Sequence, residues 1–360
     1  MRSRSIALLL LVGCGSPAAA SIPLAPAETI DARETIETGV APAMEDRPTA
    51  PTIRDTFLGE DDAPILEVLA RSEITAIERG MGGRSLAFRV TFADGSRGYF
   101  KPAQTFSGSH FYAEIASYHL DRALGLGRAP VTIGRRLPWR QLREVAGDDA
   151  RVAEVILDRN HVCGSLSHWV EEPLVRLRLG LGWEAWARFA PPLAISPFQR
   201  ARVYATEAAG GTVLQDASET RRASEMPDTS DRAAELSDLV LFDYLTENID
   251  RWGGDYTNVR TRGEGGPLVY LDNAAGFIGA SHASPSFMDA RLRSIQRFRR
   301  RTIEAIRALD IDALRARVEA DACAPILDDQ RYAQLDERRV ALLAHVERMI
   351  AEHGDAALSW

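Results

Sequence analysis

A single lysine stands out among the side chains of this sequence that could do chemistry. Lys and Arg together number 43, and 42 of these residues are Arg, so that Lys101 is the one Lys in the chain. A GC-rich genome accounts for the bias, because Arg then replaces Lys wherever a positive charge is sufficient. A Lys that remains is a candidate for a position that needs a compact ammonium group, which a planar guanidinium group cannot imitate.

Two carboxylates and an amide in the second half of the chain could act together with this lysine. Asp250 and Asn258 fall in a polar loop, and Asp272 ends a short apolar segment. Carboxylate and amide oxygens bind Mg²⁺ or Mn²⁺, and a loop Asp can accept the proton of a hydroxyl group. Glu114, thirteen residues after Lys101, could hold the ammonium group in place. Phosphoryl transfer from ATP on a kinase-type scaffold requires these residue types.

The elements that must position these residues begin with a half rich in β-strands. Four strands are expected, over 74–78, 86–92, 97–102 and 129–134. Three glycines between the first two strands have backbone N–H groups that could approach phosphates, and they are Gly80, Gly82 and Gly83. Lys101 lies on the third strand. A helix capped by Ser109 and ending near Leu124 would carry Glu114.

The second half is predicted to be mainly helical. An apolar helix over 233–246 precedes the polar loop over 248–258, and a short strand follows over 268–271. A strand end is a rigid mount for a ligand, which suits Asp272. From Ser286 onward, three helices are predicted. Residues 135–230 show no clear pattern.

Two blocks of the sequence resemble the four-jointed family of secretory-pathway atypical kinases. The first contains Gly98-Tyr-Phe-Lys-Pro and Ala113-Glu-Ile-Ala-Ser-Tyr, and it looks like the Lys/Glu region of these kinases. The second contains Thr246-Glu-Asn-Ile-Asp-Arg and Leu268-Val-Tyr-Leu-Asp-Asn, and it is closely similar to the four-jointed family. That family is related to the Golgi casein kinase and to glycan xylose kinases. The chain departs from the pattern at Trp252, where related kinases often have His.

The resemblance implies a bilobal, protein-kinase-like α+β fold that uses ATP with Mg²⁺ or Mn²⁺. A β-rich N-lobe with one key helix would occupy residues 57–190, and a mainly helical C-lobe residues 191–360. By position, Asp250 matches the catalytic residue. The nucleotide-binding residues would be Lys101 and Glu114, with the hairpin glycines Gly80, Gly82 and Gly83, and the metal ligands would be Asp272 and Asn258. The acceptor would be a Ser or Thr of an exported protein, or a glycan.

Other functions also fit the sequence, and some are disfavoured. A pseudokinase could use the same scaffold as a tethered ligand-binding or assembly module, an alternative that the scarcity of ATP outside a bacterial inner membrane supports. The scaffold could also transfer a nucleotide instead of a phosphoryl group. The net charge of −8 argues against a general nucleic-acid binder. The seven His have no zinc-ligand spacing, and no Gly-x-Ser-x-Gly elbow of a serine hydrolase occurs.

The first 56 residues are expected to direct export. A short apolar segment after Arg2 and Arg4 is too short to span a bilayer, and Leu11-Val-Gly-Cys resembles the lipobox of bacterial lipoproteins. We predict a lipoprotein signal peptide over 1–14 with lipidation at Cys14, and an ordinary signal peptide cut within 15–20 is the alternative. A flexible Pro-rich linker over 15–56 would then tether the exported protein to the membrane of the cell envelope.

Two further cysteines, Cys163 and Cys323, could form a disulfide, because disulfides persist in exported proteins. The bridge would close a loop of about 160 residues and stabilise the fold by about 5 kcal/mol in the chain-entropy description. Two buried free thiols are the alternative, since the sequence does not show whether the two residues are close in space.

Overall fold

The structure is a computed structural model, and it describes residues 55–80, 83–106, 108–179, 184, 187–189, 229–253, 256–279 and 285–360. The predicted signal peptide, the predicted lipidation site Cys14 and the linker up to residue 54 lie outside the described residues, as does Gly82. Within the described ranges, no helix has both the length and the apolar character needed to cross a membrane.

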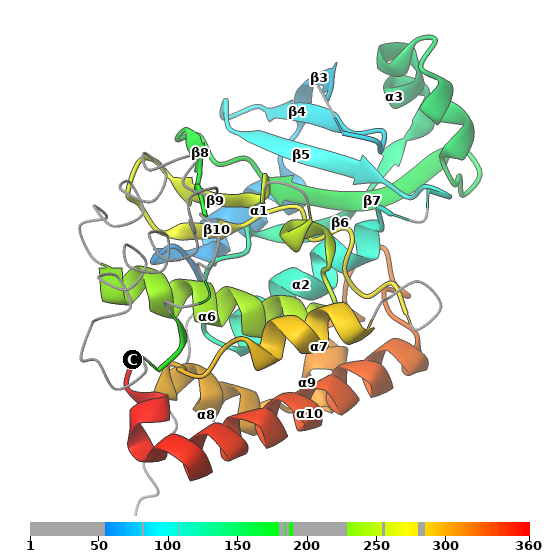
Figure 1. The fold of residues 1–360 in the computed structure, drawn as a ribbon. Coiled ribbons are helices and arrows are strands. Elements are labelled where there is room, and N and C mark those ends of the chain that lie inside the picture. Colours follow the sequence, from blue (N-terminus) through cyan, green and yellow to red (C-terminus); the bar gives the residue numbers. More distant parts are fainter. Residues whose placement is uncertain are drawn as a thin grey trace, which may run out of the picture. The chain divides into compact units, whose positions relative to one another are not determined.

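A five-stranded antiparallel sheet dominates the first half, with strand order β3-β4-β5-β7-β6 (Figure 1). Its strands are β3 Ile74–Arg79, β4 Phe88–Phe92, β5 Arg97–Pro102, β6 Thr132–Pro138 and β7 His161–His168. Side chains alternate between the two faces along β4, which buries Phe88, Val90 and Phe92. A small hairpin of β1 Thr56–Phe57 and β2 Glu60–Asp61 precedes the sheet.

The fourth predicted strand is displaced along the chain. We expected it over 129–134, whereas β6 covers Thr132–Pro138. Pro130 has no backbone N–H to donate to a ladder, so the strand begins after it. The Arg135-Arg136 pair conceals the continuation, because two consecutive charged residues, Arg135 half-buried and Arg136 exposed, interrupt the alternation of the strand.

Three helices accompany the sheet, whereas we expected one. They are α1 Asp62–Arg71, α2 Phe111–Ala123 and α3 Trp139–Ala146, and the last is followed by the 3-10 turn η1 Ala150–Glu154. The predicted cap of α2 is wrong, because His110 is the N-cap and makes no side-chain cap bond. The backbone N–H of His110 donates to the carbonyl of Ala274 at 2.7 Å, so a tertiary contact sets the start of the helix.

The second half is mainly helical, as predicted, with a small sheet beside it. The antiparallel strands of that sheet are β8 Leu174–Arg176, β9 Val259–Arg262 and β10 Leu268–Tyr270. The helices are α6 Thr229–Thr246, α7 Pro285–Arg293, α8 Arg300–Ala308, α9 Ile311–Val318 and α10 Asp329–His353, with the 3-10 turns η4 Asp250–Trp252 and η5 Gly354–Leu358.

Four α-helices follow residue 284, one more than predicted, because the chain breaks between α8 and α9. Asp310 lies at this break, and its carboxylate accepts hydrogen bonds from the backbone N–H groups of Asp312 and Ala313. An Asp in this position caps a new helix.

Helix α2 lies between two buried cores and thereby joins the two halves (Figure 1). Ile115 and Leu120 on this helix pack into the core formed by α6 and the C-terminal helices. Tyr118 packs into the core under the five-stranded sheet, with Phe88 and Phe100. A helix buried on both faces is held rigidly, so Glu114 on its first turn has a fixed position.

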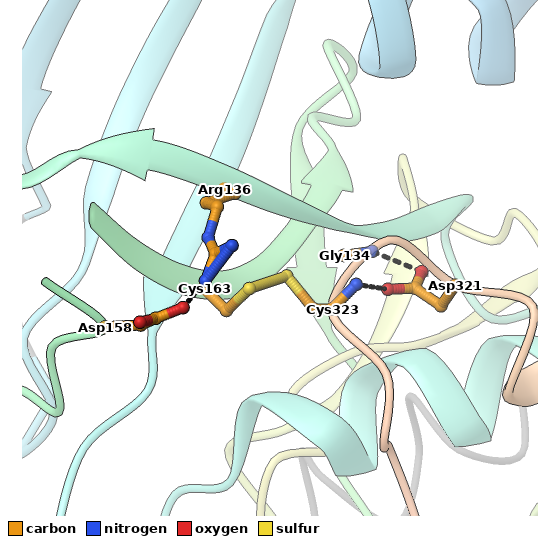
Figure 2. The surroundings of a disulfide bond; sticks show 6 residues. All are labelled: Gly134, Arg136, Asp158, Cys163, Asp321 and Cys323. Carbon is orange, nitrogen blue, oxygen red and sulfur yellow. Dashed lines mark hydrogen bonds and ion pairs between the residues drawn. A yellow bond between two sulfur atoms is a disulfide. The ribbon is translucent and has the colours of Figure 1, made fainter.

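A disulfide also links the two halves. Cys163 on β7 is bonded to Cys323, which follows α9, with a Cα–Cα distance of 5.7 Å (Figure 2). Beside it, the carboxylate of Asp321 accepts hydrogen bonds from the backbone N–H of Gly134 at 2.6 Å and of Cys323 at 2.7 Å. A covalent and a polar link therefore tie the sheet to the helical half at the same place.

Candidate active site

Lys101 lies where the sheet, α2 and the loop after β10 meet. Strand β5 is paired on both sides, with β4 and β7, which makes it a rigid support. The ammonium Nζ of Lys101 donates to Oε1 of Glu114 and to Oδ1 of Asp272, both at 2.6 Å. The Lys101 side chain is 11% exposed. One compact cation is thus shared between two carboxylates from different parts of the chain.

The charges of this cluster stabilise one another. Burial alone would lower the pKa of the Lys101 ammonium, but the Asp272 and Glu114 carboxylates outweigh burial and raise that pKa. In return, the Lys101 ammonium lowers the pKa of Asp272, although burial of the Asp272 carboxyl group by itself would raise that pKa. The ammonium and the Asp272 carboxylate are therefore both ionised at neutral pH.

Asn258 connects this cluster to Asp250. The amide Nδ2 of Asn258 lies 3.2 Å from Oδ2 of Asp272 and 3.5 Å from Oδ2 of Asp250. Asp250 is exposed at the start of η4, and the Asp272 side chain is 47% exposed. The structure therefore brings together five residues singled out from the sequence, and two of their carboxylates face solvent, where a ligand can reach them.

The backbone after β10 presents the Asp272 carboxylate to this cluster. Asp272 has a left-handed backbone, with φ of 56°, which Asp tolerates better than most residues that carry a Cβ. The next N–H group, that of Asn273, donates to Oε2 of Glu114 at 3.1 Å. Each oxygen of Glu114 thus has its own donor, one on β5 and one on the loop. Glu114 fixes the loop and the lysine relative to each other.

The glycines of the β3–β4 hairpin are needed for two different reasons. A Cβ on Gly80 would lie 2.9 Å from the Tyr99 hydroxyl oxygen, so the close packing at this position leaves no room for a side chain. Gly83 has φ of +75°, which favours glycine in a turn. Arg151 on η1 donates from Nη1 to the carbonyls of Gly83, at 3.2 Å, and Ser85, at 2.8 Å. The hairpin is thus supported from the segment between β6 and β7.

Other residues of the matched sequence blocks lie at the site and were not predicted to bind a ligand. Asn248 donates from Nδ2 to the Asp272 carbonyl at 3.4 Å and Asn273 to the Tyr270 carbonyl at 2.8 Å, so both amides shape the loops of the site. Arg251 is buried against Asp243 of α6. A signal for this pair was present, because a charged residue inside the apolar run of α6 needs a buried partner.

This chain matches the model of a known family over most of its globular part. The family is described as "Golgi casein kinase, C-terminal, Fam20", and the match covers residues 59–165 and 193–358. Among curated proteins, the human extracellular serine/threonine protein kinase FAM20C is 26% identical over 320 residues, which are 81% of this chain and 54% of that protein. A zebrafish glycosaminoglycan xylosylkinase is 27% identical, covering 60% of this chain and 56% of that protein.

Two other relatives bear on the predicted resemblance. Human four-jointed box protein 1 is 30% identical over 59% of this chain and 46% of its own length. Human pseudokinase FAM20A is 25% identical over 89% of this chain and 63% of its own length. The chain therefore spans about half the length of the first three relatives and somewhat more of the fourth.

The fold agrees with the family match. A crystal structure of the Golgi casein kinase with Mn/ADP bound superposes with a TM-score of 0.57 at 21% identity, covering 83% of this chain and 79% of that one. This likeness confirms the predicted kinase-like α+β fold, and the relatives confirm the predicted resemblance to secretory-pathway kinases. Because the family model matches well over half of its residues, the chain belongs to the Golgi casein kinase, or Fam20, family.

Proposed function

We propose that this protein is an exported ATP-dependent kinase that transfers the γ-phosphoryl group of ATP to a hydroxyl group. The observation that carries the proposal is the placing of the Lys101 ammonium between Glu114 and Asp272, with the Asn258 amide next to both Asp272 and Asp250. These five side chains come from both halves of the chain. We propose that the first half forms an N-lobe over 57–190 and the second a C-lobe over 191–360.

The nucleotide would be held by the sheet side of this arrangement. The Lys101 ammonium has two carboxylate partners, so it can turn from Asp272 toward the phosphates while Glu114 keeps it in place. Gly80 and Gly83, together with Gly82, would form the hairpin that covers the phosphates, since glycine lets backbone N–H groups approach them.

The side chains fit a divalent metal ion that is bound together with the nucleotide. Among the described residues, no cluster of three or more His, Cys, Asp or Glu side chains could hold a metal ion. Asp272 offers a carboxylate and Asn258 an amide oxygen, and Mg²⁺ is usually held by one or two protein oxygens plus phosphates. When bound, Mg²⁺ or Mn²⁺ would neutralise charge on the phosphates.

Asp250 would accept the proton of the acceptor. It is exposed, and its neighbour Asn258 orients its carboxylate without neutralising it. In the transfer, the acceptor oxygen forms a bond to the γ-phosphorus, and the bond from that phosphorus to the β–γ bridging oxygen breaks, which releases ADP. The hydroxyl proton passes to the Asp250 carboxylate.

The acceptor would be a Ser or Thr of an exported protein, or a glycan hydroxyl. The names of FAM20C and of the xylosylkinase support these two classes for the relatives. Export and attachment of the protein to the membrane through a lipid on Cys14 belong to the same proposal, and they rest on the lipobox-like sequence alone. Metabolic labelling with palmitate, comparing the full chain with Cys14→Ser, tests the anchor.

Transfer from labelled ATP tests the proposed kinase activity. The purified protein should incorporate label from γ-phosphate-labelled ATP into protein or glycan acceptors when Mg²⁺ or Mn²⁺ is present, and Asp272→Ala should abolish incorporation. Label carried by the α-phosphate should not be incorporated, which separates this reaction from nucleotide transfer. Failure to bind a metal–nucleotide complex and to modify any acceptor would refute the proposal.

A pseudokinase is the second candidate, and the similarity to pseudokinase FAM20A over 89% of the chain favours it. Such a protein would act as a tethered ligand-binding or assembly module. The double variant Asp250→Ala, Asp272→Ala distinguishes the two candidates. Retention of biological function by this variant would favour the pseudokinase, whereas loss would favour catalysis.

A further inference from the structure

Arg251 forms a buried ion pair next to the site and makes several further hydrogen bonds. It follows Asp250 directly, and its Nε donates to Oδ2 of Asp243 on α6 at 2.8 Å. Neither side chain is exposed to solvent. A buried ion pair is costly to desolvate, and apolar residues of similar volume often serve stability as well. The pair therefore calls for a reason beyond stability.

The other N–H groups of Arg251 reach both loops of the site. Nη1 donates to the carbonyl of Leu271, and it lies 3.4 Å from the carbonyl of Asn258. Nη2 donates to Oδ1 of Asn273 at 2.6 Å. Leu271 and Asn273 are the residues on either side of Asp272. One guanidinium group thus touches the chain before and after Asp272 and the backbone of Asn258.

We propose that Arg251 is a positioning residue that fixes the Asp272 loop relative to Asp250. The inference rests on the proposed function, because that function gives Asp250 and Asp272 their roles. Arg251 itself does not face the ligand. Its planar group presents donors in several fixed directions, which a lysine ammonium at the same place could not direct to Asp243 and to Asn273 together.

The anchor of this arrangement is α6. Asp243 lies in the buried, apolar part of that helix, next to Phe242 and Leu245 in the core. The Asp243 carbonyl also accepts a hydrogen bond from the backbone N–H of Asn248 at 2.9 Å. The loop that carries Asp250 is therefore tied to α6 through the backbone and through Arg251. Arg251 extends this tie to the residues on both sides of Asp272, and the weaker 3.4 Å contact of the Asn248 amide reaches the Asp272 carbonyl.

A matched control pair exists elsewhere in the chain. Arg122 on α2 is also fully buried, and its Nε lies 2.6 Å from Oδ2 of Asp62. It is eight residues after Glu114 on the helix, which corresponds to about 12 Å along the axis. Replacing Arg122 by Lys should disturb a buried ion pair to a similar degree without touching either loop of the site.

The test compares Arg251→Lys with Arg122→Lys in the otherwise unchanged protein. Thermal unfolding should show a similar loss of stability for the two variants. Calorimetric titration of Mn²⁺ in the presence of ADP should show affinity reduced by about 10- to 100-fold for Arg251→Lys, the usual range for residues that orient metal ligands, and unchanged for Arg122→Lys. The kcat of Arg251→Lys should fall by a similar factor.

A second variant covers the case in which Arg251→Lys does not fold. Asn273→Ala keeps the Arg251–Asp243 pair and removes one of the links to the loop, so it should weaken Mn²⁺ binding in the same direction but less. Affinity within about twofold of wild type in folded Arg251→Lys, or in Asn273→Ala if the former is unfolded, would overturn the inference. An equal loss in Arg122→Lys would overturn it as well.

The same titration separates the inference from the proposed function. If the wild-type protein binds Mn²⁺ with ADP but transfers no phosphoryl group, the kinase proposal fails, and weaker binding by Arg251→Lys still supports positioning of the Asp272 loop. If the wild-type protein does not bind Mn²⁺ in the presence of ADP, the kinase proposal and the positioning inference both fail.

Discussion

Replacing Lys101 by Met and by Arg separates the charge of this residue from its shape. The ammonium lies 2.6 Å from each of two carboxylate oxygens, those of Glu114 and Asp272. At an effective dielectric constant of 20, each attraction amounts to about 6 kcal/mol before desolvation is subtracted. Removal of one partner from a buried pair costs about 3–5 kcal/mol in practice. Lys101→Met should lower the free energy of unfolding by about 3 kcal/mol, the lower end, because water can reach Asp272.

Lys101→Arg keeps the charge but not the shape. Its free energy of unfolding should stay within about 1 kcal/mol of the wild type, because both carboxylates retain a cation. The guanidinium group is wider, so Glu114 and Asp272 must move apart to receive it. A displacement of about 1 Å of catalytic groups can cost about 100-fold in rate, or about 2.7 kcal/mol of the activation barrier. The kcat/KM for ATP should therefore fall about 100-fold, although the fold persists.

Urea unfolding and initial-rate kinetics with ATP and Mn²⁺ measure the two quantities on the same preparations. Arg140→Lys is the control, because Arg140 on α3 is 87% exposed in its side chain and should change neither quantity. Wild-type kcat/KM in Lys101→Arg would refute the requirement for a compact ammonium. Equal destabilisation in Lys101→Arg and Lys101→Met would refute the charge argument.

Three further predictions concern other parts of the chain. Glu114→Gln should reduce kcat/KM by about 10- to 100-fold, because the Gln amide N–H group would face either the Lys101 or the Asn273 donor and could not accept its hydrogen bond. Steady-state kinetics tests this prediction. Replacing Cys163 and Cys323 by Ser should lower the free energy of unfolding by at most about 5 kcal/mol, because the bridge closes a separation of 160 residues, and an unchanged urea midpoint would contradict it. Burial, reinforced by two nearby arginines, lowers the pKa of His119 to about 4. The unfolded chain takes up this proton at about pH 6.5, so stability should fall as the pH drops from about 6.5 to about 4, by up to about 3 kcal/mol. His119→Gln should flatten this decline in urea titrations at several pH values, whereas exposed His161→Gln should not.

Periodic patterns predicted the elements that support the site, and local chemistry misled at their ends. The strand of Lys101 was located correctly, since β5 spans Arg97–Pro102 as expected. Ser109 is a good capping residue, yet α2 starts at a contact between His110 and Ala274, which are far apart in the sequence. A pattern along the chain carries no information about such a contact. Two short helices, α1 and α3, also went unpredicted, although α1 has a local signal in the Asp61 carboxylate that caps its first turn.

That the site residues lie close together was predictable from their types and order, but the backbone hydrogen bonds that hold them were not. Residue chemistry and the resemblance nominated Lys101, Glu114, Asp250, Asn258 and Asp272, and the structure brings these five side chains together. The backbone bond from Asn273 to Glu114 could not be foreseen, because any residue supplies the same N–H group.

The two kinds of cation in this chain have different tasks at the site, and the difference follows from their shapes. Lys101 supplies a point charge that two carboxylates share at equal distances. In the proposed reaction, a phosphate would take the place of one of these carboxylates. Arg251 supplies fixed directions, with separate N–H groups for Asp243, Asn273 and the Leu271 carbonyl. An Arg at position 101 would have N–H donors in fixed directions where a compact, movable charge is needed. A Lys at position 251 would have a compact charge where N–H donors in several fixed directions are needed. Both exchanges conserve charge, and both should impair the site for opposite reasons. A codon bias toward Arg cannot explain the Lys at position 101, and the fixed donor directions give the Arg at position 251 a reason that the bias alone does not supply.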